Sequence, residues 1–260
     1  MRKFALLCGV LGVLASASYA DLGVDVGFDA GLYGNYVWRG QRRGPVGLIG
    51  NAYASKDIWG NFTLNGRLFN YTKLDAGKGI AEGQYEASLG WDPQITGGWL
   101  RNTQVAVGYI YYDRNNSAGD AAFQGDDTQE AFASLSWPGR LWNWSPYLAV
   151  YYDFDRGDHT AFGLVNDEVG TYLEGGVGRN WKLGDAGWSL DTAAKVGLDW
   201  GRNIDTFRDA VVHTGLRWNL EEGLDLLPSI DWWFPSNQVD PGANSFRPVG
   251  SLAVSYSRSY

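Results

Sequence analysis

Apolar and polar side chains alternate along short stretches through almost the whole of this 260-residue chain. Between Leu190 and Trp200, every second residue belongs to a mostly apolar set, whereas Asp191, Lys195 and Asp199 belong to the other set. Successive side chains of a β-strand point to opposite faces of a sheet, so a period of two indicates strands with one apolar and one polar face. The pattern therefore predicts an all-β fold and raises the question of which face meets water.

The alternation recurs in about twelve stretches of roughly 9 to 13 residues, which is the length that a tilted strand needs to cross a membrane. Connections after the odd stretches include long ones such as DRNNSAGDAAFQGDD, whereas those after the even stretches include PGR, LGDAG and EEG. Long and short connections alternate when hairpins have one outer and one periplasmic end. The first stretch is predicted to run from Phe28 to Trp38.

Aromatic residues gather at both ends of the predicted apolar faces. The chain has 13 Trp and 15 Tyr, yet its mean hydropathy is only −0.27. Amphipathic rings are favoured at the headgroup level of a membrane, so two belts favour a membrane barrel over a secreted soluble β-sandwich. The belt at the long-loop ends comprises Trp38, Tyr111, Phe154, Trp200 and Phe234, and the belt at the short-turn ends comprises Trp59, Trp91, Trp137, Trp181, Trp188 and Trp218.

The first twenty residues have the pattern of a cleaved Sec-type signal peptide. Arg2 and Lys3 precede an apolar run from Phe4 to Leu14, and Ser18-Tyr19-Ala20 supplies small residues at the cleavage positions. The only cysteine, Cys8, lies in this segment, so the mature chain is predicted to have no disulfides. Residues 21–260 are predicted to form one domain.

The mature chain is acidic. Without Arg2 and Lys3, 19 of the 21 basic residues remain, against 29 acidic ones, so the net charge of the mature chain is about −10. Nucleic-acid binding depends on clustered Lys and Arg that contact phosphates, so nucleic acid is not a predicted partner.

These features together predict a closed antiparallel transmembrane β-barrel of about 12 strands in the outer membrane, with both termini periplasmic. An unpaired backbone amide costs several kcal/mol in lipid, so a sheet can span a membrane only when it closes on itself. The apolar face would then meet lipid, including lipopolysaccharide, and the polar face would line the interior.

The C-terminal stretch SLAVSYSRSY resembles the assembly signal of Gram-negative outer-membrane β-barrels, in which alternate apolar residues lead to a terminal aromatic residue. The resemblance implies recognition by the barrel assembly machinery. The chain departs from the usual pattern in ending on Tyr and in placing Arg258 in the apolar phase. The matching residues are Leu252, Val254, Tyr256 and Tyr260.

A second resemblance lies near the start, in GNYVWRGQRRGPVGLIGNAYAS from Gly34 to Ser55. It is similar to the opening of a family of functionally uncharacterised proteobacterial barrel proteins, in which a strand ending in Tyr-x-aromatic-Arg-Gly precedes a second alternating strand. This resemblance implies a barrel and no activity.

The inward set contains many ionisable residues, with acids in excess. Buried charges persist only when they are paired or hydrated, so the interior must be a wet passage or a network of ion pairs. The first possibility predicts a porin-like channel for passive passage of small solutes, with a preference for cations. The residues predicted to line the lumen are Asp29, Tyr33, Asn35, Arg39, Arg67, Glu86, Glu130, Tyr151, Asp153, Glu174, Lys195, Asp199, His213, Arg217 and Asp231.

Several tyrosines share the inward phase. Their rings have two possible roles, stacking against a passing sugar or base and filling the barrel so that nothing passes. Sequence phase leaves both open. They are Tyr33, Tyr53, Tyr147, Tyr151 and Tyr172.

Two other functions compete with a channel. Outer-membrane phospholipases place a His and a Ser on the lipid-facing wall, but here His159 lies in a predicted loop and His213 in the inward phase, so no catalytic residues are predicted. A structural or surface-interaction role for the long loops is the other alternative. The acidic loop with Asp113, Asp120, Asp126 and Asp127 lacks EF-hand spacing, so no metal or cofactor is predicted.

Overall fold

A computed structural model of the chain describes residues 23–38, 41–44, 46–74, 80–98, 100–114, 128–140, 142–153, 170–200, 206–236 and 246–259. Within these residues, the chain forms one closed barrel with the strand order β1-β14-β13-β12-β11-β10-β9-β8-β7-β6-β5-β4, and β2 and β3 form a separate two-stranded sheet. The predicted twelve-stranded antiparallel barrel is therefore confirmed. No helix in the described ranges is long and apolar enough to span a membrane.

The strands are β1 (Val24–Tyr33), β2 (Tyr36–Trp38), β3 (Gln41–Gly44), β4 (Gly47–Asp57), β5 (Phe62–Lys73), β6 (Ile80–Trp91), β7 (Gln104–Arg114), β8 (Thr128–Ser136), β9 (Ser145–Asp153), β10 (Gly170–Lys182), β11 (Trp188–Trp200), β12 (Thr206–Glu221), β13 (Leu224–Pro235) and β14 (Arg247–Ser259).

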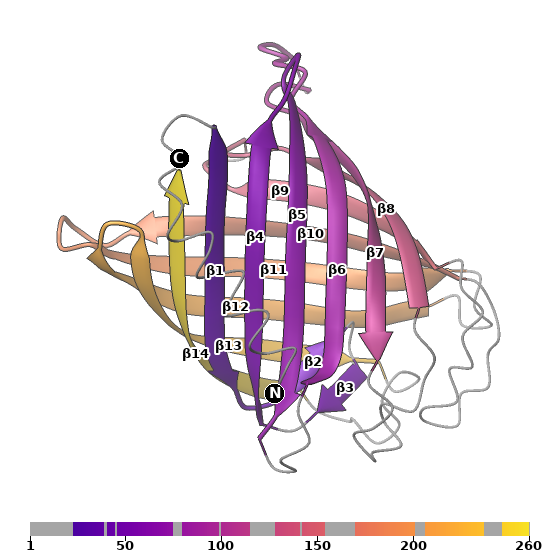
Figure 1. Cartoon of the computed structure of the whole chain (residues 1–260), viewed down its shortest axis with the longest axis vertical. Coiled ribbons are helices and arrows are strands. Elements are labelled where there is room, and N and C mark those ends of the chain that lie inside the picture. The colour runs from indigo at the N-terminus through magenta and orange to yellow at the C-terminus, as the bar shows by residue number, and fades with distance from the viewer. Residues whose placement is uncertain are drawn as a thin grey trace.

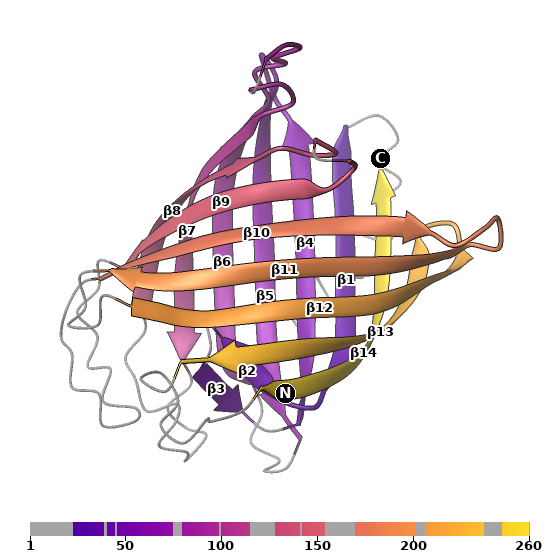
Figure 2. The same ribbon diagram turned by 180° about the vertical axis from the view of Figure 1, so that it is seen from behind.

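The barrel has two walls whose strands cross at a steep angle. In Figure 1, strands β1 and β4–β7 run along the front, and β9–β13 run across them behind. Figure 2 shows the same crossing from the other side. Strands must tilt for a sheet to close on itself. We call β1 and β4–β7 the front wall and β9–β13 the rear wall.

The first and last strands close the barrel. β1 pairs antiparallel with β14 from Asp25↔Ser259 to Tyr33↔Ser251, and with β4 on its other side. The start of β1 and the end of β14 therefore lie at the same end of the barrel, together with the tight turn between β12 and β13. We call this the short-turn end, and the opposite end, where β1 ends and β4 begins, the long-loop end.

Along each strand, one set of side chains faces out and the other faces in. On β11, Leu198 is 43% exposed while its neighbour Asp199 is 7% exposed. The large exposed apolar residues of the other strands follow the same set, among them Leu32, Leu64, Val107, Leu148, Ile230 and Leu252. The outer surface of the barrel is thus apolar and the inner surface polar, the arrangement of a transmembrane barrel in the outer membrane.

The first strand is shorter than the sequence predicts. β1 ends at Tyr33, and the backbone amide of Gly34 donates to the carbonyl of Gly250 at 2.9 Å. The chain then leaves the wall, so Asn35 is not part of a barrel strand, and Tyr36 begins the separate β2–β3 sheet. The prediction of a strand continuing to Trp38 was wrong because the alternation of β2 follows that of β1 without a break.

Two other strands are longer than predicted. β5 continues to Lys73 and β6 begins at Ile80, so much of NYTKLDAGKGIAEG (residues 70–83), which the sequence pattern predicts as a long connection, belongs to the wall. Tyr71 and Glu82 pair across these strands and are both almost fully buried. Their burial stabilises strand structure that the alternation of apolar residues alone did not indicate.

Aromatic residues line the outer rim at the short-turn end. Trp188 stacks on Trp218 with ring centroids 4.8 Å apart, and Phe62 stacks between Trp59 and Trp91. At the long-loop end, Trp200 and Phe234 are exposed on the outer face. Of the other predicted belt residues at this end, Phe154 and the side chain of Trp38 lie outside the described residues.

A β-bulge changes the inward set on the rear wall. Gly197 pairs with Asp209 and Leu198 with Phe207, which leaves Arg208 as the additional residue on β12. A bulge turns two successive side chains toward the same face. Arg208 and Asp209 are accordingly both buried inside the barrel.

Candidate pore lining

A chain of polar contacts crosses the inner surface of the front wall. Asn51 on β4 donates through its Nδ2 to Asp29 on β1 at 2.7 Å, and its Oδ1 accepts from the guanidinium of Arg67 on β5 at 2.9 Å. Arg67 also lies 3.9 Å from Glu86 on β6, and its side chain is 48% exposed. The antiparallel register places these residues opposite one another, because Asn51 pairs with Asp29 and Arg67 with Glu86.

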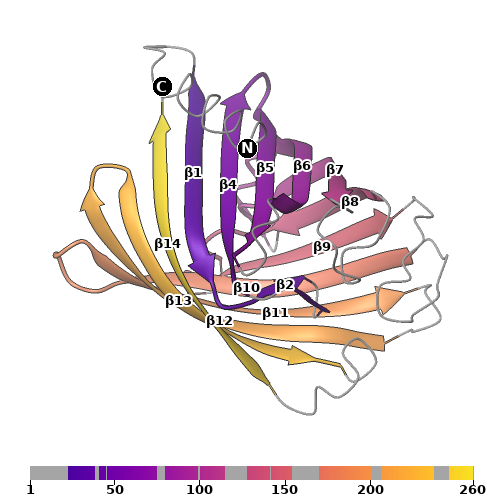
Figure 3. The same cartoon turned by 60° about the horizontal axis from the view of Figure 1, so that its bottom comes forward.

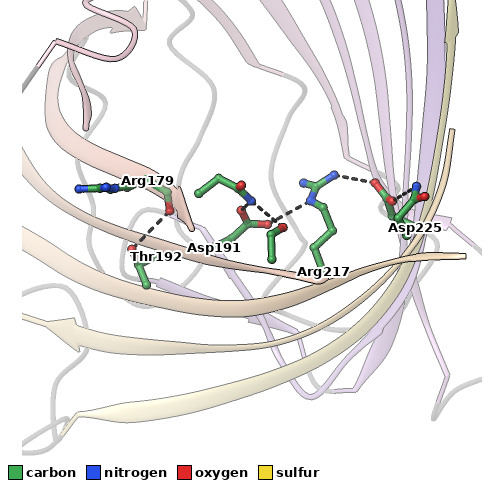
Figure 4. A network of polar contacts seen from close by, with 8 residues as sticks. Arg179, Asp191, Thr192, Arg217 and Asp225 are labelled. Carbon is green, nitrogen blue, oxygen red and sulfur yellow. Dashed lines mark hydrogen bonds and ion pairs between the residues drawn. The ribbon is translucent and has the colours of Figure 1, made fainter. Parts of the chain in front are cut away.

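The rear wall carries a matching chain toward the short-turn end (Figure 4). Arg217 on β12 donates to Asp225 on β13 at 2.7 Å and to Asp191 on β11 at 3.3 Å. Asn180 on β10 donates to the same Asp191 at 2.6 Å. The Arg217 side chain is 41% exposed, so this ion-pair chain is only partly covered by its neighbours.

Nearer the middle of the rear wall, Glu174 on β10 accepts hydrogen bonds from three side chains. Its Oε2 accepts from Lys195 Nζ at 2.9 Å, and its Oε1 accepts from the hydroxyl of Tyr147 at 2.7 Å. The hydroxyl of Tyr172 lies 3.3 Å from Glu174 and 3.2 Å from Asp209. Lys195 thus points into the interior with its charge balanced by a carboxylate.

At the long-loop end, the polar side chains are buried. Glu130 accepts from the Tyr112 hydroxyl at 2.8 Å, and Asp153 accepts from the Thr128 hydroxyl at 3.0 Å. Arg208 pairs with Asp199, and both side chains are almost completely buried. These pairs form a row of buried polar contacts on the inner face of β7–β12 at the long-loop end.

His213 lies on the inward face of β12 opposite Asp231 on β13. Its Nδ1 is 2.6 Å from Asp231 Oδ1, and a neutral or a charged ring can donate from that nitrogen. Nearby, the hydroxyls of Ser229 and Ser251 are 2.6 Å apart. The His–Asp pair faces the lumen and not the lipid.

Several inward aromatic rings lie on glycines of the neighbouring strand. A Cβ atom added at Gly27, Gly176 or Gly197 would overlap the ring of Tyr53, Tyr147 or Tyr172 respectively. Such rings cover the bare glycine backbone of the next strand. Tyr151 instead lies between the rings of Phe132 and Tyr172, at centroid distances of 5.7 and 6.0 Å. These contacts give the tyrosines a packing role in the wall.

The structure places the remaining predicted residues as follows. Tyr33 is half-buried at the end of β1, opposite Ser251 and Gly47. Asn35 lies beyond the wall, and Arg39 lies outside the described residues. Sequence reasoning missed Arg208 and Asp209, because a bulge leaves no mark in the alternation. It also missed Glu82, because the apolar positions near it are too sparse to extend the strand.

In the part of the chain that the structure describes, no three or more His, Cys, Asp or Glu side chains are grouped so as to hold a metal ion. The interior polar residues instead bond to one another across strands.

The fold is similar to that of known outer-membrane proteins. An outer membrane channel from Pseudomonas putida F1 has 11% identity and a TM-score of 0.54, with 93% of this chain and 97% of that chain covered. The NanC porin has 7% identity and a TM-score of 0.53, with 90% of this chain and 99% of that chain covered. Outer membrane phospholipase A from Escherichia coli has 13% identity and a TM-score of 0.53, with 89% of this chain and 92% of that chain covered. At these identities the likeness concerns the fold alone.

Comparison of sequences gives no relative. No protein-family profile matches the chain, and no curated protein does.

Proposed function

We propose that this protein is a channel for the passive passage of small solutes across the outer membrane, with a preference for cations. The observation that carries the proposal is the partial exposure of charged side chains inside a closed wall. Arg67, Lys195 and Arg217 are 48%, 33% and 41% exposed although they point inward. Charged groups keep this exposure only where water surrounds them.

The cation preference rests on the sign of the inward charge. A lumen lined by excess carboxylates concentrates cations and repels anions. The inward acids of the described strands include Asp29, Glu82, Glu86, Glu130, Asp153, Glu174, Asp191, Asp199, Asp209, Asp225 and Asp231, and the inward bases include Arg67, Lys73, Lys195, Arg208, Arg217 and Arg247.

Recordings in planar lipid bilayers test both the channel function and the cation preference. Purified protein should produce discrete conductance steps, and a KCl gradient should give a reversal potential of the sign for K⁺ permeation. Absence of steps, together with absence of swelling of proteoliposomes in any sugar or amino acid, would contradict the channel. Steps with a reversal potential favouring Cl⁻ would contradict the cation preference alone.

A lipid hydrolase is less favoured. His213 and Asp231 are paired as in many hydrolases, but they face the lumen, whereas a membrane lipid reaches the outer wall. Lipid hydrolysis that is lost in His213→Ala and retained in His159→Ala would favour the lipid hydrolase over the channel.

The partners of the barrel follow from the same proposal. The outward face would contact lipid and lipopolysaccharide, and the C-terminal residues Leu252, Val254, Tyr256 and Tyr260 would bind the barrel assembly machinery. Residues 1–20 would be removed on export. Truncation of Tyr260 should lower the amount of folded protein in the outer membrane, measured by heat-modifiable gel mobility.

A further inference from the structure

The β2–β3 hairpin lies inside the barrel. Figure 3 shows its two strands within the outline of the barrel, between the front and rear walls. They form their own sheet and pair with no barrel strand. Figures 1 and 2 place the hairpin at the long-loop end, with β3 at the rim of the barrel.

One apolar contact holds the hairpin against the wall. Val37 on β2 packs against a cluster of Val211, Trp233 and Val249. These three residues come from β12, β13 and β14 and belong to the inward set, because their neighbours Val212 and Phe234 are exposed on the outside. An apolar cluster on an otherwise polar inner surface has this hairpin as its partner.

A backbone bond fixes where the hairpin begins. The amide of Gly34 donates to the carbonyl of Gly250 on β14 at 2.9 Å, one residue beyond Val249 of the apolar cluster. The hairpin is thus attached to the wall at its base and at Val37. Both attachments are at the long-loop end.

Polar and aromatic side chains are buried elsewhere at the long-loop end. Tyr112, Glu130, Asp153, Asp199 and Arg208 are buried there along β7–β12. The hairpin lies against the other part of the ring, at β12–β14. It therefore takes up part of the opening at this end, whereas the charged side chains of the short-turn half are partly exposed.

We infer that the β2–β3 hairpin is the constriction of the pore and sets the size of solute that passes. The inference rests on the proposed channel function. It also gives a role to the YVWRGQRRG stretch, which includes both hairpin strands.

Removal of the hairpin is the first test. Tyr33 pairs with Gly47 across β1 and β4, so a two-residue Asn-Gly turn in place of residues 35–45 still closes the β1–β4 hairpin. We expect a higher unit conductance than that of the unchanged protein, and faster swelling of proteoliposomes in larger sugars. The control removes an equal length from residues 115–127, which connect β7 and β8 at the same end.

Val37→Asp tests the apolar contact of the hairpin with the wall without a deletion. A carboxylate cannot be buried against Val211, Trp233 and Val249 without a partner, so the hairpin should leave the wall and the conductance should rise. Val37→Ile keeps an apolar side chain and should conduct like the unchanged protein. Heat-modifiable gel mobility shows that each variant is folded.

A cysteine pair tests the position directly. Val37→Cys combined in turn with Val211→Cys, Trp233→Cys or Val249→Cys should form a disulfide under mild oxidation in at least one combination, detected by mass spectrometry, and the single variants should not. No disulfide would overturn the docking of the hairpin in the lumen.

The outcomes separate the two proposals. If the unchanged protein conducts and neither the deletion nor Val37→Asp conducts more, the constriction is wrong and the channel stands. If only the altered proteins conduct, the hairpin blocks the barrel and the proposed passive channel is wrong for the native chain. If nothing conducts, both are wrong.

Discussion

At the scale of single residues, glycines on the inner wall are sites of close packing. Tyr147 covers Gly176 so closely that a Cβ atom there would overlap its ring, whereas a Cβ at Gly50, in the outward set of β4, would meet nothing within 4 Å. The same residue type therefore tolerates substitution at one place and not at the other.

Gly176→Ala should lower the free energy of unfolding by about 1–3 kcal/mol, because the ring of Tyr147 must shift. Gly50→Ala should leave it unchanged or raise it by about 0.4–1 kcal/mol through lower entropy of the unfolded chain. Urea titration of the refolded protein in lipid vesicles measures both. Equal effects of the two variants would contradict the packing role of the ring.

The buried pair of Arg208 and Asp199 gives a second residue-level prediction. Arg208→Met leaves the Asp199 carboxylate buried without its cation, so unfolding should become easier by about 3–5 kcal/mol. Adding Asp199→Leu removes the unpaired charge and should restore most of that stability. A double variant no more stable than Arg208→Met would show that the pair is not the cause.

Residue-level contacts were the part of the site least accessible from sequence. Phase alone assigned Asp29, Glu174 and His213 to the inward set, because a strand has only two faces. Their partners depend on the register of the next strand: Asn51 and Asp231 lie directly opposite Asp29 and His213, whereas Lys195 lies two residues from Gly197, which is opposite Glu174. Register is set by pairing and turn geometry, which alternation does not encode.

At the scale of elements, the outer rim at the short-turn end is a girdle of paired rings. Trp188 and Trp218 face each other across β11 and β12 with planes tilted by 9°. Stacked rings contribute about 0.5–1.5 kcal/mol beyond their buried area. The girdle therefore stabilises the pairing of two strands as well as their depth in the membrane.

Trp218→Ala should lower the free energy of unfolding by about 2–4 kcal/mol, since it removes both the stack and part of the apolar surface. Trp200→Ala is the matched control, because Trp200 is 65% exposed at the opposite end of the same outer face. Its effect should be smaller. Urea titration in vesicles again measures the difference, and a larger loss at Trp200 would contradict the role of the stack.

Elements were predicted well where the alternation is strict and poorly where it changes. β11 and β13 have unbroken apolar sets, and their faces were assigned correctly from the sequence. The end of β1 was misplaced because Gly34 and Asn35 keep the phase while the chain leaves the wall. The hairpin β2–β3 was invisible for the same reason, since its packing on Val249 depends on a contact far along the chain.

At the scale of the whole molecule, charged side chains divide into a buried region at the long-loop end and a more exposed region in the short-turn half. Ionised pairs at the long-loop end are buried, whereas those of the short-turn half are exposed to the lumen. Only the exposed groups act on passing ions without a change of structure.

Removal of a single positive or a single negative charge in the exposed region should shift the preference for cations over anions in opposite directions. Arg217→Gln removes a positive charge and should increase the permeability ratio of K⁺ to Cl⁻, whereas Asp29→Asn should decrease it. Reversal potentials in a KCl gradient give the ratio. Both effects should weaken between about 0.1 M and 1 M salt, as the screening length falls from about 10 Å to 3 Å. Shifts of the same sign in both variants would contradict the assignment of these residues to the pore.

The central claim is that polar side chains line a water-filled interior and apolar ones meet lipid, and alternate residues of β11 test it most directly. Single cysteines at positions 192 to 196, in protein reconstituted into vesicles, are treated with a water-soluble thiol reagent and labelling is measured by mass spectrometry. The account predicts that Ala193→Cys and Lys195→Cys are labelled, and that Thr192→Cys, Ala194→Cys and Val196→Cys are protected by lipid. Protection at 193 and 195 with labelling at 194 and 196 would contradict it.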